Sequence, residues 1–234
     1  MLAPLIWMLS ASLKVNQFSV YGPLFHEWNF SNYIEVFKTI PVWKGLLNSV
    51  IVAVPSIIVG TFVSGLAAYA FAKIKFKFCN IIFILMLAVM MIPFPVIMIP
   101  QYYIFSDLDW IGTLLPLIIP KLFGNIMMIF FLRQFLTHIP DALVESAKID
   151  GANHFQIFWI IILPLLKPAL VSVAILSGLS TWKDLLWPLI VNNSMEKYTL
   201  SAGLALLIGE HTTIYPHVMA GSFLAVWPMI LLYF

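Results

Sequence analysis

The sequence has few charged residues. Asp, Glu, Lys and Arg make up 9% of its 234 residues, against about 25% in an ordinary soluble domain. Hydrophobic residues make up 62%, more apolar surface than a water-soluble fold of this length could bury. The formal net charge is +2 and no long basic run occurs, so nucleic acid is not expected as a partner. The composition therefore predicts a protein of the lipid bilayer.

Groups that support catalysis or cofactor binding are also scarce. The single cysteine, Cys79, excludes an internal disulfide and is interpreted as an ordinary membrane residue. The five histidines show no H-E-x-x-H or comparable spacing, so no metal site is expected. The sequence has no glycine-rich phosphate loop of the form G-x-x-x-x-G-K-S/T, so any ATP must be bound by another polypeptide. We expect no cofactor in this chain and no enzymatic activity.

Long runs without charge locate the expected membrane spans, because about 20 apolar residues are needed to cross the hydrocarbon core. Six transmembrane helices are predicted, at approximately residues 1–13, 45–72, 78–104, 112–132, 165–190 and 217–234. The first run is too short to cross alone and the last stops inside apolar sequence, so both terminal spans are expected to be truncated. The predicted fold class is an all-α polytopic membrane protein, with the whole chain forming a single transmembrane domain.

Basic residues set the expected orientation of these spans. Three lysines crowd residues 73–77, the short loop between spans two and three. Three more basic residues lie in or beside the loop between spans four and five: Arg133, Lys148 and Lys167. Cytoplasmic loops carry an excess of Lys and Arg, so both loops are placed on the cytoplasmic side. The loops at residues 14–44 and 191–216 then face outward.

Two patterns inside the spans predict local structure. Gly60, Ser64 and Ala68 recur every four residues, which places small side chains on one helix face and allows a neighbouring helix to approach closely. Three prolines between residues 93 and 100 must kink or break span three, because each removes a backbone hydrogen bond and its ring clashes with the preceding turn.

Charged residues within the spans are candidates for a transport pathway. A charge at the bilayer centre costs at least about 2.5–3.5 kcal/mol, so Lys121, Lys183 and Asp184 are expected to face protein or water. One hypothesis places Asp184 in the subunit interior, with Lys121 as a candidate partner and Trp182 beside the pathway. In the alternative, residues 181–188 lie near the outer end of span five, where both neighbouring charges reach water. The residues leave both interpretations open.

A polar segment interrupts the apolar sequence at residues 140–163. Pro140 suits a first helical turn, and Gly151 supplies the left-handed residue that ends a helix. Asn153 and Gln156 have the spacing of a reciprocal cap for a second helix. The segment therefore predicts two short helices that meet at a glycine corner, on the cytoplasmic side, between spans four and five.

The same segment resembles a known family. Residues 145–152 read Glu-Ser-Ala-Lys-Ile-Asp-Gly-Ala and residues 161–164 read Ile-Ile-Leu-Pro. This pattern resembles the "E-A-A, three residues, G … I-x-L-P" signature of membrane-spanning subunits of ABC importers. Flanking stretches such as residues 66–72 and 182–190 are similar to the carbohydrate-uptake branch, in particular to the smaller permease of maltose-type systems.

Two residues depart from the family pattern. Ser146 replaces the usual second alanine of the triad, a small-for-small change, and Lys183 stands where the family usually has Asn. The resemblance implies that residues 140–163 form cytoplasmic coupling helices that dock on an ABC ATPase, with Glu145 as the polar anchor. The coupling residues that it implies are Ala142, Glu145, Ser146, Ala147, Asp150 and Gly151.

The resemblance also implies the chain's partners and location. They are ABC ATPase subunits that bind the ATP, a second and larger permease, and an extracytoplasmic solute-binding protein, assembled in a bacterial or archaeal cell membrane. The implied solute is a sugar or another neutral polar molecule. The alternative is an ion-coupled secondary transporter, which often has paired broken helices, whereas only one broken span is predicted here.

Overall fold

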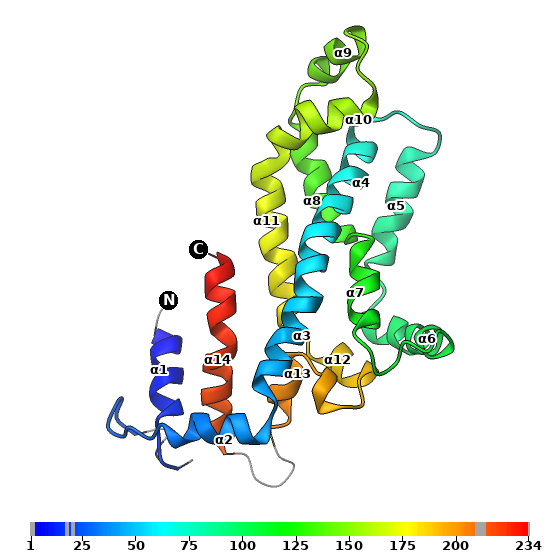
Figure 1. Cartoon of the computed structure of the whole chain (residues 1–234). Coiled ribbons are helices and arrows are strands. Elements are labelled where there is room, and N and C mark those ends of the chain that lie inside the picture. Colours follow the sequence, from blue (N-terminus) through cyan, green and yellow to red (C-terminus); the bar gives the residue numbers. More distant parts are fainter. Residues whose placement is uncertain (1–2, 17–18, 20–21, 209–213, 234) are drawn as a thin grey trace. The chain divides into compact units, whose positions relative to one another are not determined.

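The computed structural model describes residues 3–16, 19, 22–208 and 214–233, and within them the regular elements are helices (Figure 1). The chain divides into two compact units. The first unit comprises residues 1–52, 111–114 and 179–234, and the second comprises residues 53–110 and 115–178. Helices α3 (Val42–Pro55) and α11 (Leu163–Trp182) contribute residues to both units.

The first unit is built around α14 (Tyr215–Tyr233), which packs against α1 (Ala3–Ser12) and α2 (Ser31–Thr39) (Figure 1). Its buried core includes Val36 and Trp182. The Trp182 indole Nε1 donates a hydrogen bond to the Ala225 carbonyl oxygen at 3.1 Å, so this ring has a packing role within the unit. The remaining short helices are α12 (Leu186–Val191), η4 (Met195–Lys197) and α13 (Leu200–Ala205).

The second unit holds the polar segment. Its core packs α4 (Thr61–Lys73) against α8 (Ile126–Thr137) and includes Leu132, Phe158 and Leu166, all buried. Its other elements are η2 (Ser56–Gly60), α5 (Cys79–Val89), α6 (Phe94–Asp107), α7 (Leu115–Leu122), α9 (Asp141–Ile149), α10 (His154–Ile157) and η3 (Phe158–Ile162).

The predicted face of small residues is confirmed within this unit. A Cβ atom at Gly60 would lie 2.5 Å from the Lys121 carbonyl oxygen, so the backbones approach as closely as glycine allows. The Ser64 hydroxyl donates to the Gly60 carbonyl oxygen at 2.7 Å and accepts from the Asn125 amide at 3.2 Å. Ala68 is fully buried in the core.

Helix lengths bear on the predicted spans. By length and apolar composition, three described helical stretches can cross a membrane: Val42–Lys73, Leu115–Thr137 and His154–Trp182. The helices Cys79–Val89 and Phe94–Asp107 form a fourth candidate, bent by 96° at the break. Helices α1 and α14 lie where the terminal spans are predicted, of which residues 1–2 and 234 are outside the described residues. The count of six spans stays a prediction.

The prolines break span three as expected, because the break covers residues 90–93 and ends at Pro93, directly before α6. Pro100 lies inside α6 without ending it. One other detail of the spans differs from the sequence-based expectation. The span predicted at 165–190 is interrupted, because α11 ends at Trp182 and α12 begins at Leu186. Lys183 and Asp184 therefore lie in the break between these two helices, so the prediction of one continuous span through them is wrong.

Candidate functional site

The polar segment forms two short helices that meet at Gly151. Gly151 has φ 85°, the left-handed conformation predicted for it. Its amide donates to the Lys148 carbonyl oxygen at 3.0 Å, and the Ala152 amide donates to the Ala147 carbonyl oxygen at 2.9 Å. These two bonds close the end of α9 as a Schellman motif. The corner is therefore defined by backbone hydrogen bonds within a few residues.

The two helix starts agree in part with the sequence. Asn153 and Gln156 form the predicted reciprocal cap, each side chain accepting from the other residue's backbone amide at 2.9 Å. Pro140 is not in the first helical turn as expected. It precedes the turn with ψ 135°, and the Ile139 carbonyl oxygen before it accepts a hydrogen bond from the side chain of Lys73. The chain becomes helical only at Asp141.

Helix α9 turns one face to the core and the other outward. Val144 and Ala147 are buried, so Ala147 packs inward and does not lie on the exposed face. The other residues predicted to couple are exposed: Ala142, Glu145, Ser146, Asp150 and Gly151. Sequence reasoning missed Ile149, which is 86% exposed. An apolar side chain in an otherwise polar stretch was the signal available for it.

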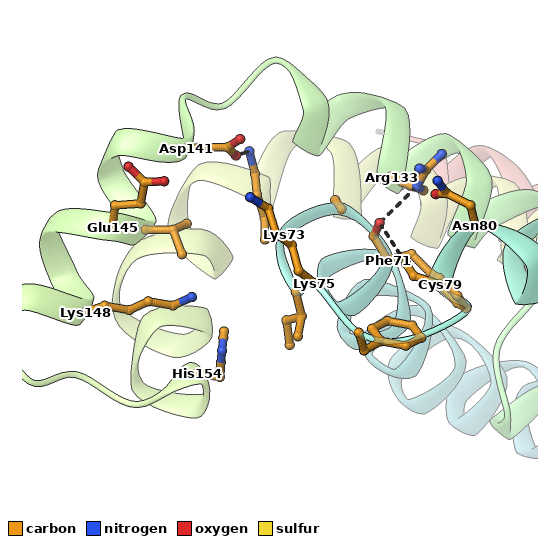
Figure 2. A pocket seen from close by; sticks show the side chains of 14 residues that line it. Phe71, Lys73, Lys75, Cys79, Asn80, Arg133, Asp141, Glu145, Lys148 and His154 are labelled. Carbon is orange, nitrogen blue, oxygen red and sulfur yellow. Dashed lines mark hydrogen bonds and ion pairs between the residues drawn. The ribbon is translucent and has the colours of Figure 1, made fainter.

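An ion pair joins α9 to α4. The Lys73 amine lies against the Asp141 carboxylate (Figure 2). It donates to that carboxylate and to the Ile139 carbonyl oxygen, each at 2.5 Å. The Lys73 side chain is only 3% exposed, whereas that of Asp141 is 75% exposed. The hydrogen bond from Lys73, and then its positive charge, lower the pKa of the Asp141 carboxyl below its usual range.

A second contact joins α10 to α4. The Tyr69 hydroxyl lies 3.1 Å from His154 Nδ1, at hydrogen-bonding distance. The Tyr69 ring also packs against Phe158, with the ring centroids 5.5 Å apart. Both short helices are thus attached to α4, one at its last residue and the other one turn earlier.

A cavity of about 530 Å³ lies beside α9, where α4 ends and α5 begins (Figure 2). Four cations and two carboxylates line it, leaving a net charge of +2 with histidine neutral. Its lining residues are Phe71, Ala72, Lys73, Ile74, Lys75, Phe76, Cys79, Asn80, Arg133, Asp141, Val144, Glu145, Lys148 and His154.

Arg133 is fixed in the wall of this cavity. Its Nε donates to the Phe71 carbonyl oxygen at 3.2 Å. Its guanidinium carbon lies 4.1 Å from the centroid of the Phe83 ring, a cation–π contact. These two contacts hold the planar guanidinium group of Arg133 in one orientation.

The candidate pathway residues are distributed over both units. Asp184 and Trp182 belong to the first unit and Lys121 to the second. Each of the two charged residues has interactions of its own, and pairing between them stays a prediction. Among the described residues, no three His, Cys, Asp or Glu side chains are grouped closely enough to hold a metal ion.

Comparisons with a family model and with related sequences identify one family. The family model described as "Binding-protein-dependent transport system inner membrane component" matches residues 57–234. The arabinooligosaccharides transport system permease protein AraQ of Halalkalibacterium halodurans is 34% identical over 203 residues, which cover 86% of this chain and 72% of that protein. A probable ABC transporter permease protein of Pyrococcus horikoshii is 34% identical over 239 residues, covering 99% and 86%.

A more distant relative and a solved structure extend this picture. The lactose transport system permease protein LacG of Rhizobium radiobacter is 28% identical over 232 residues, covering 99% of this chain and 85% of that protein. A chain in the crystal structure of a bacterial ABC transporter involved in alginate import superposes with a TM-score of 0.80 at 24% identity, covering 99% of this chain and 88% of the other. The superposition shows a shared helical fold.

Proposed function

The chain belongs to the binding-protein-dependent family of inner membrane transport components, in its carbohydrate-uptake branch, and from this premise we propose that it is the smaller permease subunit of an ATP-driven importer. Its relatives are transport components and not enzymes. The proposal assigns ATP binding and hydrolysis to a separate ABC ATPase, and assigns coupling to residues 140–163 on the cytoplasmic side.

The observation that carries this proposal is the way α9 and α10 are attached. Their outward face is exposed, while their inward face belongs to the same core as α4 and α8. Lys73 links α9 to the end of α4, and the Tyr69–His154 contact links α10 to the same helix. A partner that moves α9 therefore also moves α4, because packed cores shift as units.

The exposed face of α9 has the chemistry to dock in a groove. Glu145 can accept a charge-assisted hydrogen bond from a basic side chain of the ATPase, a strong and directional contact. Ile149 can bury an apolar surface against the same partner. Ala142 and Ser146 have small side chains, so the helix surface around Glu145 and Ile149 does not protrude and can enter a groove.

The other partners follow from the architecture expected of such an importer. One chain with a single coupling segment cannot enclose a pathway alone, so a second and larger permease is proposed to complete it. An extracytoplasmic solute-binding protein would deliver the solute to the outward loops at residues 14–44 and 191–216. Asp184, Trp182 and Lys121 remain the proposed pathway residues.

The proposed solute is a neutral saccharide. Two of the relatives named above are permeases for arabinooligosaccharides and lactose, and ionisable groups are scarce in the apolar helices. A charged solute would need buried countercharges, because an unpaired charge is costly within the membrane.

The proposal is tested by purifying the chain from cells that express its genomic neighbours. We expect an ATPase and a second permease to co-purify, and liganded solute-binding protein to raise ATP hydrolysis. Glu145→Gln should reduce that stimulation, whereas Asp107→Asn, which neutralises an exposed carboxylate outside the segment and outside both outward loops, should not. A chain that purifies alone and moves solute along an ion gradient without ATP would identify a secondary transporter instead.

A further inference from the structure

The basic cavity beside α9 lies at the ends of all three membrane-length helices. The stretch Val42–Lys73 ends at it, Leu115–Thr137 ends one turn beyond Arg133, and His154–Trp182 begins at it. The hydrocarbon core is about 30 Å thick, so helices of 23 to 32 residues extend out of it into the region of the lipid headgroups. The cavity is therefore placed where phospholipid phosphates are found.

Two of the lysines that line the cavity are less engaged than Lys73, since Lys75 attracts the Asp141 carboxylate only through space. Lys73 is occupied by Asp141 and Ile139, but the amines of Lys75 and Lys148 make no hydrogen bond or ion pair with the part of the chain that the structure describes. Both residues are exposed. Figure 2 shows the Lys148 side chain extending toward the space between α9 and the turn that carries Lys75.

The opposite wall offers a donor suited to phosphate. Arg133 uses one N–H on the Phe71 carbonyl oxygen, which leaves the other guanidinium donors for a ligand. A guanidinium held by stacking is pre-organised for bidentate contact with phosphate. Asn80 lies next to it in Figure 2 and adds an amide to the same wall.

We infer that this cavity binds the phosphate of an anionic phospholipid headgroup, with Lys75, Lys148 and Arg133 as its contacts. Basic pockets between transmembrane helices on the cytoplasmic side bind such headgroups. The net charge of +2 favours an anionic headgroup over a zwitterionic one, whose amine would meet the same lysines. Phe71 and Phe76 supply an apolar wall next to the phosphate. The inference needs the membrane location and does not rest on the identity of the solute or the ATPase.

The position of the site means that a bound lipid would affect how α9 is attached to α4. Lys75 follows α4 and Lys148 belongs to α9, so one phosphate would bridge the same two elements that the Lys73–Asp141 pair joins. A lipid bound there would stiffen the attachment of α9, because it adds a second ionic link between α9 and the end of α4.

The test uses the assembled complex in nanodiscs that contain phosphatidylglycerol and phosphatidylcholine. Native mass spectrometry after detergent release counts the phosphatidylglycerol molecules retained. The cavity variant is Lys75→Gln with Lys148→Gln. The control is Lys77→Gln with Lys197→Gln, which removes the same charge from two exposed lysines outside the cavity. We expect the cavity variant to bind phosphatidylglycerol about 30-fold more weakly, from two lost lysine contacts, and the control to bind as the unmodified complex does.

Further measurements distinguish a lipid phosphate from a soluble phosphate compound as the ligand. If the cavity variant loses binding of inorganic phosphate but retains as much phosphatidylglycerol as the control, the site takes a soluble phosphate compound and the lipid assignment is wrong. Equal retention by the cavity and control variants would also overturn it. A cavity variant that keeps its lipid but loses the ATPase would show that the surface belongs to a protein partner. ATPase co-purification is measured separately from lipid retention. A failure of the lipid site therefore does not decide the permease assignment, which is tested by co-purification alone.

Discussion

The amine of Lys73 is shared between the Asp141 carboxylate and the Ile139 carbonyl oxygen, so the last residue of α4 holds the first residue of α9. The two ends of this link are in different surroundings. The lysine side chain is buried and the carboxylate is exposed. The two hydrogen bonds are therefore expected to contribute different free energies to the attachment of α9. The difference can be measured by removing the bonds separately.

Lys73→Met is expected to weaken the attachment of α9 more than Asp141→Asn does. The methionine change removes both bonds, including the charged bond to a carbonyl oxygen, which contributes about 1.5–3 kcal/mol. The asparagine change leaves that bond in place and weakens an exposed ion pair that contributes about 1 kcal/mol or less. Binding-protein-stimulated ATP hydrolysis and the thermal stability of the complex report the difference. Equal effects from both variants would show that the exposed pair dominates.

The Lys73–Asp141 pair is expected to be insensitive to pH near neutrality. Lys73 lowers the pKa of Asp141, so the contribution of this carboxylate to stability is present above its unfolded pKa of about 3.9 and is lost as pH falls through the lower folded value. Between about pH 5 and 8 the carboxylate stays ionised. The difference in melting temperature between the unmodified chain and Asp141→Asn should therefore be constant over that range, and a marked slope would contradict the assignment.

Gly151→Pro is expected to abolish transport while leaving membrane insertion intact. Proline is fixed near φ −65° and cannot adopt the φ of 85° found at this corner. Gly151→Asn is the matched control, because asparagine tolerates the left-handed conformation and a Cβ atom there would meet nothing within 4 Å. Transport in vesicles and co-purification of the ATPase measure both variants. Normal transport by the proline variant would remove the corner from the coupling model.

Gly60→Ala is expected to destabilise the chain by about 1–3 kcal/mol, the cost of forcing atoms into a packed interface. The added methyl would lie 2.5 Å from the Lys121 carbonyl oxygen, which is backbone and cannot move aside cheaply. Gly203→Ala is the control, since that glycine lies in a helix with no atom within 4 Å of the new Cβ. Thermal unfolding of the purified complex should show a loss for the first change and no loss for the second.

Asn153→Ala is expected to loosen the start of α10. The asparagine side chain accepts the Gln156 amide, and loss of such a cap costs about 1 kcal/mol. Hydrogen exchange of the amides at residues 154–157 should quicken about fivefold, the factor that this free energy represents. Ser146→Ala, on the exposed face of α9, should leave those rates unchanged.

Features that depend on neighbours along the chain were predictable from the sequence. The left-handed Gly151, the Asn153–Gln156 cap and the break near Pro93 each follow from conformational rules that act over a few residues. The small-residue face was predictable too, because helical periodicity places Gly60, Ser64 and Ala68 together.

Features that depend on distant parts of the chain were not predictable. Lys73 and Asp141 are 68 residues apart, and no local rule pairs them. The same link explains the misplaced start of α9, since the Ile139 carbonyl oxygen is directed to Lys73 before the helix begins. The break at Lys183 and Asp184 did have a local signal, because Pro188 cannot donate to the Asp184 carbonyl oxygen and its ring clashes with that carbonyl in a continuous helix. The inward position of Ala147 depends on the rotation of α9, which the core settles.

The corner between α9 and α10 is closed by backbone hydrogen bonds and a cap that lie wholly within residues 147–156. Its shape is therefore independent of which side chains project from the outer face of α9. The conformation of the corner and the chemistry of the docking face can therefore vary independently. Substitutions at Glu145 or Ile149 can therefore change which ATPase the face fits without changing the backbone of the corner. The same backbone corner can in this way be used with different ATPase partners.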